Sequence, residues 1–220
     1  MRKVFKYLLF CLMCHAVAAT AADVAPPAIR LAMSIDALDV EHHWPAGVHV
    51  NWETGAPDGK PESGEGKHTH CSAFVAAAAK RLGIYILRPP QHGQILLANA
   101  QYDWLAAEGQ RQGWRELQDA GAAQHAANIG YFVVATYKNR REQKPGHIAI
   151  VRPSDKSEQS IRAEGPQITQ AGGKNYRSTA LKVGFAAHPD AWNKADVRYY
   201  AHAVDPTAKS NDEVHPHSGE

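Results

Sequence analysis

The residue best suited to covalent chemistry in this 220-residue chain is Cys71, which stands where a polar loop gives way to an alanine-rich run. The run contains strong helix formers and is followed by Gly83, a typical helix stop. Cys71 is therefore predicted in the first turn of a helix, where unpaired backbone N–H groups and the helix dipole favour a thiolate and lower the thiol pKa. The alternative is a buried, inert cysteine on the core face of that helix.

A cysteine nucleophile needs a base within hydrogen-bond reach, and the base needs a third group that orients it. Among the 13 histidines, His147 is the candidate base because it opens an apolar segment directly after Gly146. The start of a strand is a rigid place from which to aim an imidazole, and a glycine lets another backbone or a substrate approach closely. The alternative is a partly buried histidine that merely satisfies its own hydrogen bonds.

The start of the chain is typical of a secretory signal. A basic beginning is followed by the apolar run 7–19 and by small residues up to Ala22, which predicts a signal peptide over residues 1–22 and a periplasmic or secreted protein. Cleavage would remove Cys11 and Cys14 and leave Cys71 alone. A lone thiol in an oxidising compartment is a liability unless it is used or hidden.

The remainder of the chain fits one domain over residues 23–205, with a disordered tail over 206–220. The sequence has 24 Lys and Arg against 22 Asp and Glu, and the predicted signal holds three of the basic residues and none of the acidic ones. A charge so close to balance indicates neither a nucleic-acid partner nor, after signal cleavage, a membrane partner.

The residue patterns predict an α+β fold in which helices pack against one antiparallel sheet. Helices are expected over 29–38, 69–83, 94–108 and 114–128, with 25–27 as a linker before them. Strands are expected over 48–52, 131–137, 146–152, 160–164 (continuing into 167–170) and 196–204. The segment 54–67, rich in Gly, Pro and charge, is expected to form a loop at one wall of a cleft beside Cys71.

Two motifs, His70-Cys71-Ser72-Ala73-Phe74-Val75 and Pro145-Gly146-His147-Ile148-Ala149-Ile150-Val151, resemble those of the NlpC/P60 superfamily. These are papain-like cysteine peptidases and amidases that act on peptidoglycan, and the CHAP amidases are near relatives. The resemblance covers roughly residues 65 to 170. It implies a papain-like fold, with Cys71 as the nucleophile and His147 as the base.

The resemblance also implies a third polar residue on the strand after the histidine, and Glu164 occupies a comparable place, as in CHAP enzymes. A turn centred near residue 155 or 156 would bring residues 163–165 past His147, and Glu164 is the only ionisable acceptor in that window. Gln167 and Gln170 remain alternatives that require a bulge to slide into register.

Other candidate residues surround the cysteine. His68, His70 and Cys71 suit zinc by type, but their spacing leaves a fourth ligand unspecified, so no metal and no other cofactor is predicted. Asn51 and Trp52, which precede the loop, and His70 are candidates for substrate contact.

Together these observations predict an exported cysteine hydrolase that cleaves amide bonds in peptidoglycan by acyl transfer. The expected partners are peptidoglycan stem peptides and a proteinaceous inhibitor. Two alternatives remain open: a protein-directed papain-like peptidase or acyltransferase, and a cell-wall binding module without activity. The bond that is cleaved is left open.

Overall fold

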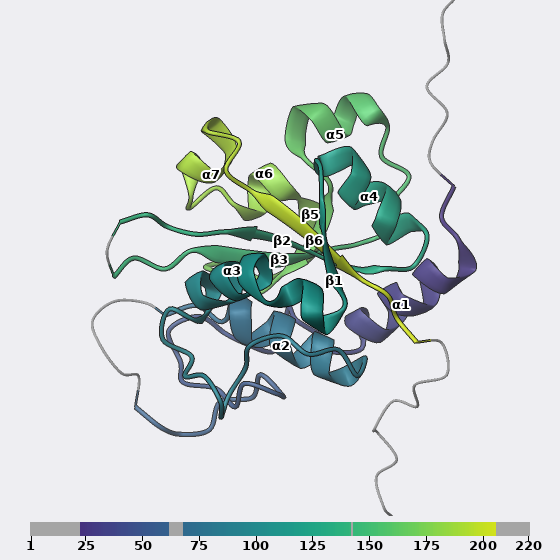
Figure 1. The fold of residues 1–220 in the computed structure, drawn as a ribbon. Helices are drawn as coiled ribbons and strands as arrows, with labels where there is room; N and C mark the ends of the chain where they lie inside the picture. Colours follow the sequence, from purple (N-terminus) through teal and green to yellow (C-terminus); the bar gives the residue numbers. More distant parts are fainter. Residues whose placement is uncertain (1–22, 62–67, 142, 206–220) are drawn as a thin grey trace, which may run out of the picture.

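A computed structural model describes residues 23–61, 68–141 and 143–205 of the chain (Figure 1). The predicted signal and the predicted tail lie outside these residues. Within them the fold is α+β, with helices on both faces of one six-stranded antiparallel sheet, as the sequence predicts in class. No helix in the described ranges is both long enough and apolar enough to cross a membrane.

The sheet has the order β1-β6-β2-β3-β4-β5, and every neighbouring pair is antiparallel. Its strands are β1 (Trp114–Leu117), β2 (Phe132–Tyr137), β3 (His147–Val151), β4 (Gln167–Gln170), β5 (Tyr176–Ala180) and β6 (Arg198–His202). The helices are α1 (Pro26–Asp36), α2 (Cys71–Arg81), α3 (Leu97–Ala107), the 3-10 helix η1 (Gly109–Gln112), α4 (Ala120–Asn128), α5 (Glu158–Glu164), α6 (Leu181–Gly184) and α7 (Pro189–Asn193).

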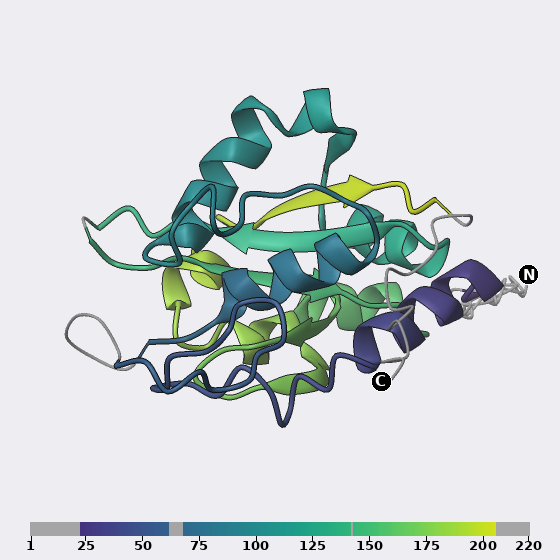
Figure 2. The same cartoon turned by 90° about the horizontal axis from the view of Figure 1, so that it is seen from below.

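The two faces of the sheet carry two separate cores, because side chains alternate along each strand. Ile148 and Ile150 of β3 pack with α1, α2 and α3, whereas Ala149 and Val151 pack with α4 and the segment around α6. Figure 2 shows α2 lying along the first face. The central strands β2 and β3 are buried at every position, so the middle of the sheet is a rigid support for the side chains at the ends of these strands.

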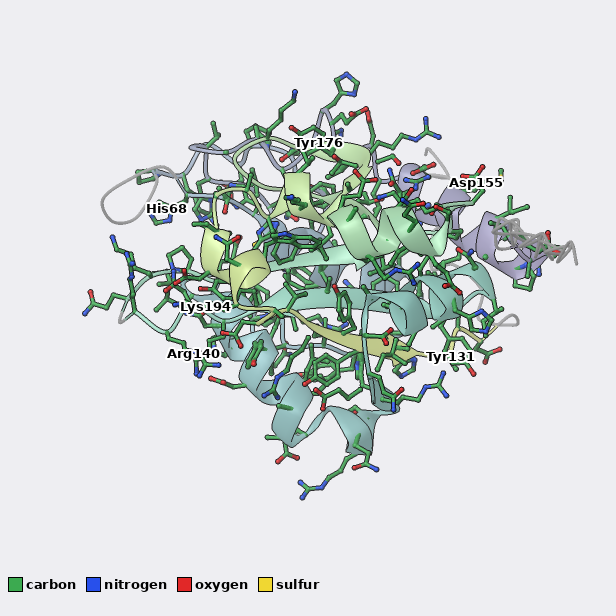
Figure 3. All side chains as sticks on the ribbon, turned by 90° about the horizontal axis from the view of Figure 1, so that it is seen from above. His68, Tyr131, Arg140, Asp155, Tyr176 and Lys194 are labelled. Atoms are coloured by element: carbon green, nitrogen blue, oxygen red, sulfur yellow. The ribbon has the colours of Figure 1, made fainter. Side chains whose placement is uncertain are left out.

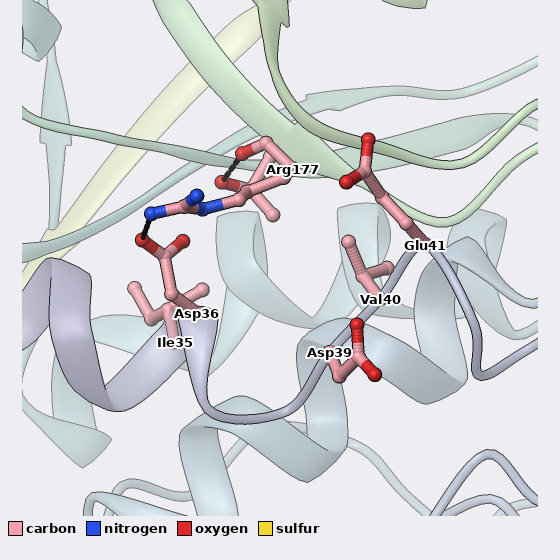
Figure 4. A pocket seen from close by; sticks show the side chains of 7 residues that line it. Ile35, Asp36, Asp39, Val40, Glu41 and Arg177 are labelled. Carbon is pink, nitrogen blue, oxygen red and sulfur yellow. Dashed lines mark hydrogen bonds and ion pairs between the residues drawn. The ribbon is translucent and has the colours of Figure 1, made fainter.

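Helix α1 is tied to the sheet by an ion cluster. Both carboxylate oxygens of Asp36 accept hydrogen bonds from Arg152, at 2.9 and 3.2 Å, and Arg177 donates to the same carboxylate at 2.8 Å. Figure 4 shows Arg177 reaching Asp36 beside a small pocket of about 20 Å³. Burial pushes the pKa of Asp36 upward, but the hydrogen bonds and charges of the two arginines outweigh burial and hold this pKa below its ordinary value.

The helix predicted over 69–83, with Cys71 in its first turn, is confirmed. Helix α2 runs from Cys71 to Arg81, and Gly83 follows with a φ of 71°, its N–H bonded to the carbonyl of Lys80. Nine consecutive residues from Cys71 to Ala79 are buried, which explains the run of alanines: only small side chains let the helix lie so close to the sheet.

Four element predictions are wrong. Residues 114–117 form β1, and the helix begins only at Ala120, where the Asp119 side chain accepts a hydrogen bond from the backbone N–H of Ala122. Residues 160–164 belong to α5, whose first turn is capped by Ser157. Residues 48–52 make only an isolated bridge between Val50 and Pro57, and the linker expected over 25–27 mostly belongs to α1.

Candidate active site

Cys71 lies at the first position of α2 and opens onto a cleft at one end of the sheet. The cleft has a volume of about 580 Å³. Its described lining residues are His68, Thr69, Cys71, Ser72, Gln94, Ile95, Leu96, Leu97, Ala98, Gln143, Lys144, Pro145, Gly146, Ala187 and His188. Figure 3 labels His68 at the same end of the molecule as Arg140 and Lys194. The cleft therefore lies beside the connection between β2 and β3, with an apolar wall at the start of α3.

The sulfur of Cys71 is only slightly exposed, at 4% for the residue, and several donors face it. The backbone N–H groups of Ile148, Ser72 and Cys71 and the side chain of Thr69 favour the thiolate and so act to lower the pKa of the Cys71 thiol. Burial outweighs these donors, however, and raises the pKa of the Cys71 thiol above its ordinary value. The expected lowering of this pKa is thus wrong: in the free protein Cys71 is a neutral thiol at neutral pH.

The influence of the Ile148 N–H on the thiol shows that the Cys71 sulfur lies beside the start of β3, the strand that His147 opens. Gly146 permits the close approach of β3 to β2, because a Cβ at that position would collide with the carbonyl of Tyr137, the β2 residue that pairs with His147. The close approach of two backbones, rather than any positive φ, is what requires the glycine.

The ring of His147 is buried, and Gln170 orients it. Nε2 of His147 lies 2.7 Å from Oε1 of Gln170. The Gln170 amide is fixed in turn, because its Nε2 donates to the carbonyl of Lys174 at 3.2 Å. Since Oε1 can only accept, His147 must carry its proton on Nε2, and Nδ1 is left unprotonated. That is the tautomer that can accept a proton from a thiol.

Glu164 does not occupy the orienting position that the sequence prediction gave it. It lies in α5 and pairs with Lys156 at 2.8 Å, with 45% of its side chain exposed. The predicted register fails because α5 fills the connection that was taken for a tight turn. Strands β3 and β4 pair Ile150 with Thr169, so the centre of the connection lies near residue 160 rather than 155. This longer return puts Gln170, the alternative left open, beside β3, whereas Gln167 bonds Ser178.

Burial also controls the charge state of His147. It lowers the pKa of His147 from 6.5 to about 4, and the hydrogen bond that His147 donates to Gln170 offsets only part of this effect. At neutral pH the candidate pair is therefore a thiol and a neutral imidazole, not a thiolate and an imidazolium. The proton would move only when the sulfur attacks.

The three predicted substrate contacts have structural roles outside the residues that line the cleft. The side chain of Asn51 accepts hydrogen bonds from the backbone N–H groups of Glu53 and Thr54 and so closes a turn. Trp52 packs partly buried against the core, with the Lys80 ammonium 5.5 Å from its ring centroid. His70 is buried, and its Nε2 lies 2.8 Å from the carbonyl of Val48.

Sequence reasoning missed several residues at the site. The apolar wall at 94–98 was read only as the start of a helix, although Ile95 is 66% exposed and Leu96 has a φ of 53°, unusual for a branched side chain. His188 was also missed, and the His-Pro pair it forms with Pro189 was the available signal, since such pairs mark turns.

No metal centre is formed in the described part of the chain: no group of three or more His, Cys, Asp or Glu side chains there is placed to hold an ion. Comparison with known proteins adds nothing to the geometry. No protein-family model matches this chain, and no curated protein matches it.

Proposed function

We propose that this chain is an exported cysteine hydrolase of the NlpC/P60 kind, with a papain-like arrangement, that cleaves amide bonds in peptidoglycan. One observation carries the proposal: a cysteine at a helix start opens onto a cleft and lies beside the start of the strand that carries His147, a histidine whose tautomer is fixed by a buried glutamine. The peptidoglycan substrate rests on the sequence resemblance and on the predicted signal peptide.

The first half of the reaction forms a thioester. Nδ1 of His147 takes the thiol proton as the sulfur of Cys71 attacks the amide carbonyl. The negative oxygen of the tetrahedral intermediate would be stabilised by the backbone N–H of Cys71 at the start of α2. The imidazolium then gives its proton to the leaving amine as the carbon–nitrogen bond breaks.

The second half releases the acid. A water molecule loses a proton to Nδ1 and attacks the thioester, and the returning proton restores the thiol. Gln170 supports both halves because its acceptor oxygen holds the Nε2 proton in place and so keeps Nδ1 unprotonated and ready to accept a proton. An amide in this position orients the ring without adding a negative charge.

The test is digestion of purified sacculi, followed by separation of the released muropeptides. The wild-type protein should release new fragments whose masses identify the cleaved bond. Cys71→Ala should release none while keeping its circular dichroism spectrum and melting temperature, because alanine is well suited to a buried helical position. Hydrolysis by this variant at the wild-type rate would exclude Cys71 as the nucleophile.

The same digestion separates the alternatives. A cell-wall binding module would sediment with the sacculi and release nothing. A protein-directed peptidase would neither bind nor cleave them but would still react at Cys71 with peptide-based electrophiles. Either result would overturn the peptidoglycan hydrolase proposal.

A further inference from the structure

A second imidazole lies against the candidate base. The ring of His188 stacks on the ring of His147 with centroids 5.4 Å apart and an interplanar angle of 19°. Phe185 approaches the same ring edge-on at 4.6 Å. His188 lines the cleft, whereas His147 is only 4% exposed. The His188 ring therefore lies between the base and the cleft that holds Cys71.

The backbone between α6 and α7 holds both covering rings in place. The N–H of His188 bonds the carbonyl of Phe185 at 2.8 Å, and the carbonyl of His188 accepts from Ala191 at 2.9 Å in the first turn of α7. Tyr137 packs against the other flank of His188, with centroids 5.7 Å apart. The position of His188 is thus set by the chain on both sides and by a strand of the sheet.

The proposed reaction uses one imidazole, so the second needs its own explanation. Burial, followed by the neighbouring His147, lowers the pKa of His188 to about 4. A neutral ring at that place can serve neither as an anion site nor as a cation at neutral pH. What it can do is exclude water from the ring beneath it.

We propose that His188 is a positioning residue whose ring covers the His147 imidazole and keeps that base neutral by excluding water from it. The covering itself rests on the stacking geometry, and its effect on catalysis rests on the proposed function. The property to be tested is the protonation of His147. The titratable or charged side chains around it and around its cover are Cys71 on α2, Tyr137 on β2, Lys144 in the cleft wall, His188, and, beyond Tyr137, Arg140, Asp190, Lys194 and Asp196.

The first experiment follows the His147 ring by NMR as pH is changed, in the full chain. His188→Phe keeps a ring in the stack and should leave the His147 titration midpoint near its wild-type value. His188→Ala opens the ring to water, so the midpoint should rise toward 6.5. His42→Ala, which removes an exposed histidine, is the control for unspecific effects. If alanine prevents folding, His188→Asn removes the ring while keeping a polar group, and the same rise is expected.

The second experiment is the pH profile of wall hydrolysis. With a midpoint of 6.5, about 3% of His147 would be neutral at pH 5, against about 90% with a midpoint near 4. His188→Ala should therefore lose up to about 30-fold in kcat at pH 5 and little at pH 8, with KM nearly unchanged, whereas His188→Phe should follow the wild type.

The two experiments fail separately. An unchanged His147 midpoint in His188→Ala and in His188→Asn would overturn the covering role, whatever the activity. A wild-type protein that hydrolyses no wall material would overturn the proposed function, and the NMR titration would still decide whether His188 covers His147.

Discussion

The buried state of His147 makes a quantitative prediction about stability against pH. Its pKa in the folded protein is about 4, below the value of 6.5 for an exposed imidazole. Between these two values the unfolded chain binds a proton that the folded chain does not. The contribution of His147 to stability is therefore fully present above pH 6.5 and is lost as the pH falls toward 4.

The size of this loss follows from the two pKa values. Proton uptake by the unfolded state lowers the free energy of unfolding by well under 1 kcal/mol at pH 7.0 and by roughly 2–3 kcal/mol at pH 4.5. His147 alone should thus account for roughly 2 kcal/mol of lost stability between these conditions. That is a large share of the 5–15 kcal/mol typical of small domains, as an order of magnitude.

The assay is urea unfolding of the wild type and of His147→Gln at both pH values. Glutamine does not titrate, and its amide can still donate to Gln170, so the variant keeps the hydrogen bond while removing the proton site. The variant will be less stable at both pH values, but its loss between pH 7.0 and 4.5 should be smaller than that of the wild type by about 2 kcal/mol. Carboxylates such as Asp36, and the imidazole of His188, contribute to the loss in both proteins. Equal losses would refute the claim that His147 is buried in its neutral form.

Three further predictions concern the rest of the site and the anchor of α1. Gln170→Ala should slow hydrolysis by roughly 5- to 150-fold, because leaving a buried donor of His147 unpaired costs about 1–3 kcal/mol. The matched control Glu164→Ala should leave the rate and the urea midpoint close to wild type. If Glu164→Ala slowed hydrolysis more than Gln170→Ala, Glu164 rather than Gln170 would be the residue that orients His147. The rate of Cys71 alkylation by iodoacetamide should rise with a midpoint above about 8.5, because burial raises the thiol pKa; a midpoint well below this would mean that an imidazolium stabilises the thiolate. Asp36→Ala should lower the free energy of unfolding by roughly 3 kcal/mol, because it leaves Arg152 without its carboxylate and the Arg152 side chain is only 12% exposed. A loss of less than about 0.5 kcal/mol would show that water solvates the ion cluster.

Local sequence patterns predicted the elements that hold Cys71 and His147. The alanine run with Gly83 behind it determines α2, and the β-branched and aromatic residues around Val134 and Ile150 determine β2 and β3. These patterns are reliable because each is long or strongly biased, and because the same residues form the buried core of the sheet.

The secondary-structure predictions that were wrong concern short segments. Residues 160–164 alternate Ile and Ala with polar residues, which suits a strand as well as one turn of helix. What decides is the Ser157 cap together with Gly165, whose φ of 79° ends the helix. The segment 114–117 failed for the opposite reason: it becomes a strand by pairing with β6, which lies more than 80 residues away, and this pairing leaves no local signature in a segment of four residues. The error in the first segment moved the register and with it the third residue of the site.

The charge state of the candidate pair could not be predicted from the sequence, because two effects of unequal size compete at Cys71. A helix start favours a thiolate by about 0.3–1 kcal/mol, and up to about 2 kcal/mol in partly buried sites, which is an effect that spacing reveals. Burial of an ionisable group shifts its pKa by as much as 3–5 units, or roughly 4–7 kcal/mol, and depends on residues such as His188 that arrive from a distant part of the chain. Burial raises the pKa of Cys71 and lowers the pKa of His147. Both shifts favour the neutral thiol and the neutral imidazole over the ion pair. A substrate that displaces the remaining water from the cleft would strengthen this preference, so in the proposed mechanism the proton transfer from sulfur to Nδ1 belongs to the bond-forming step itself.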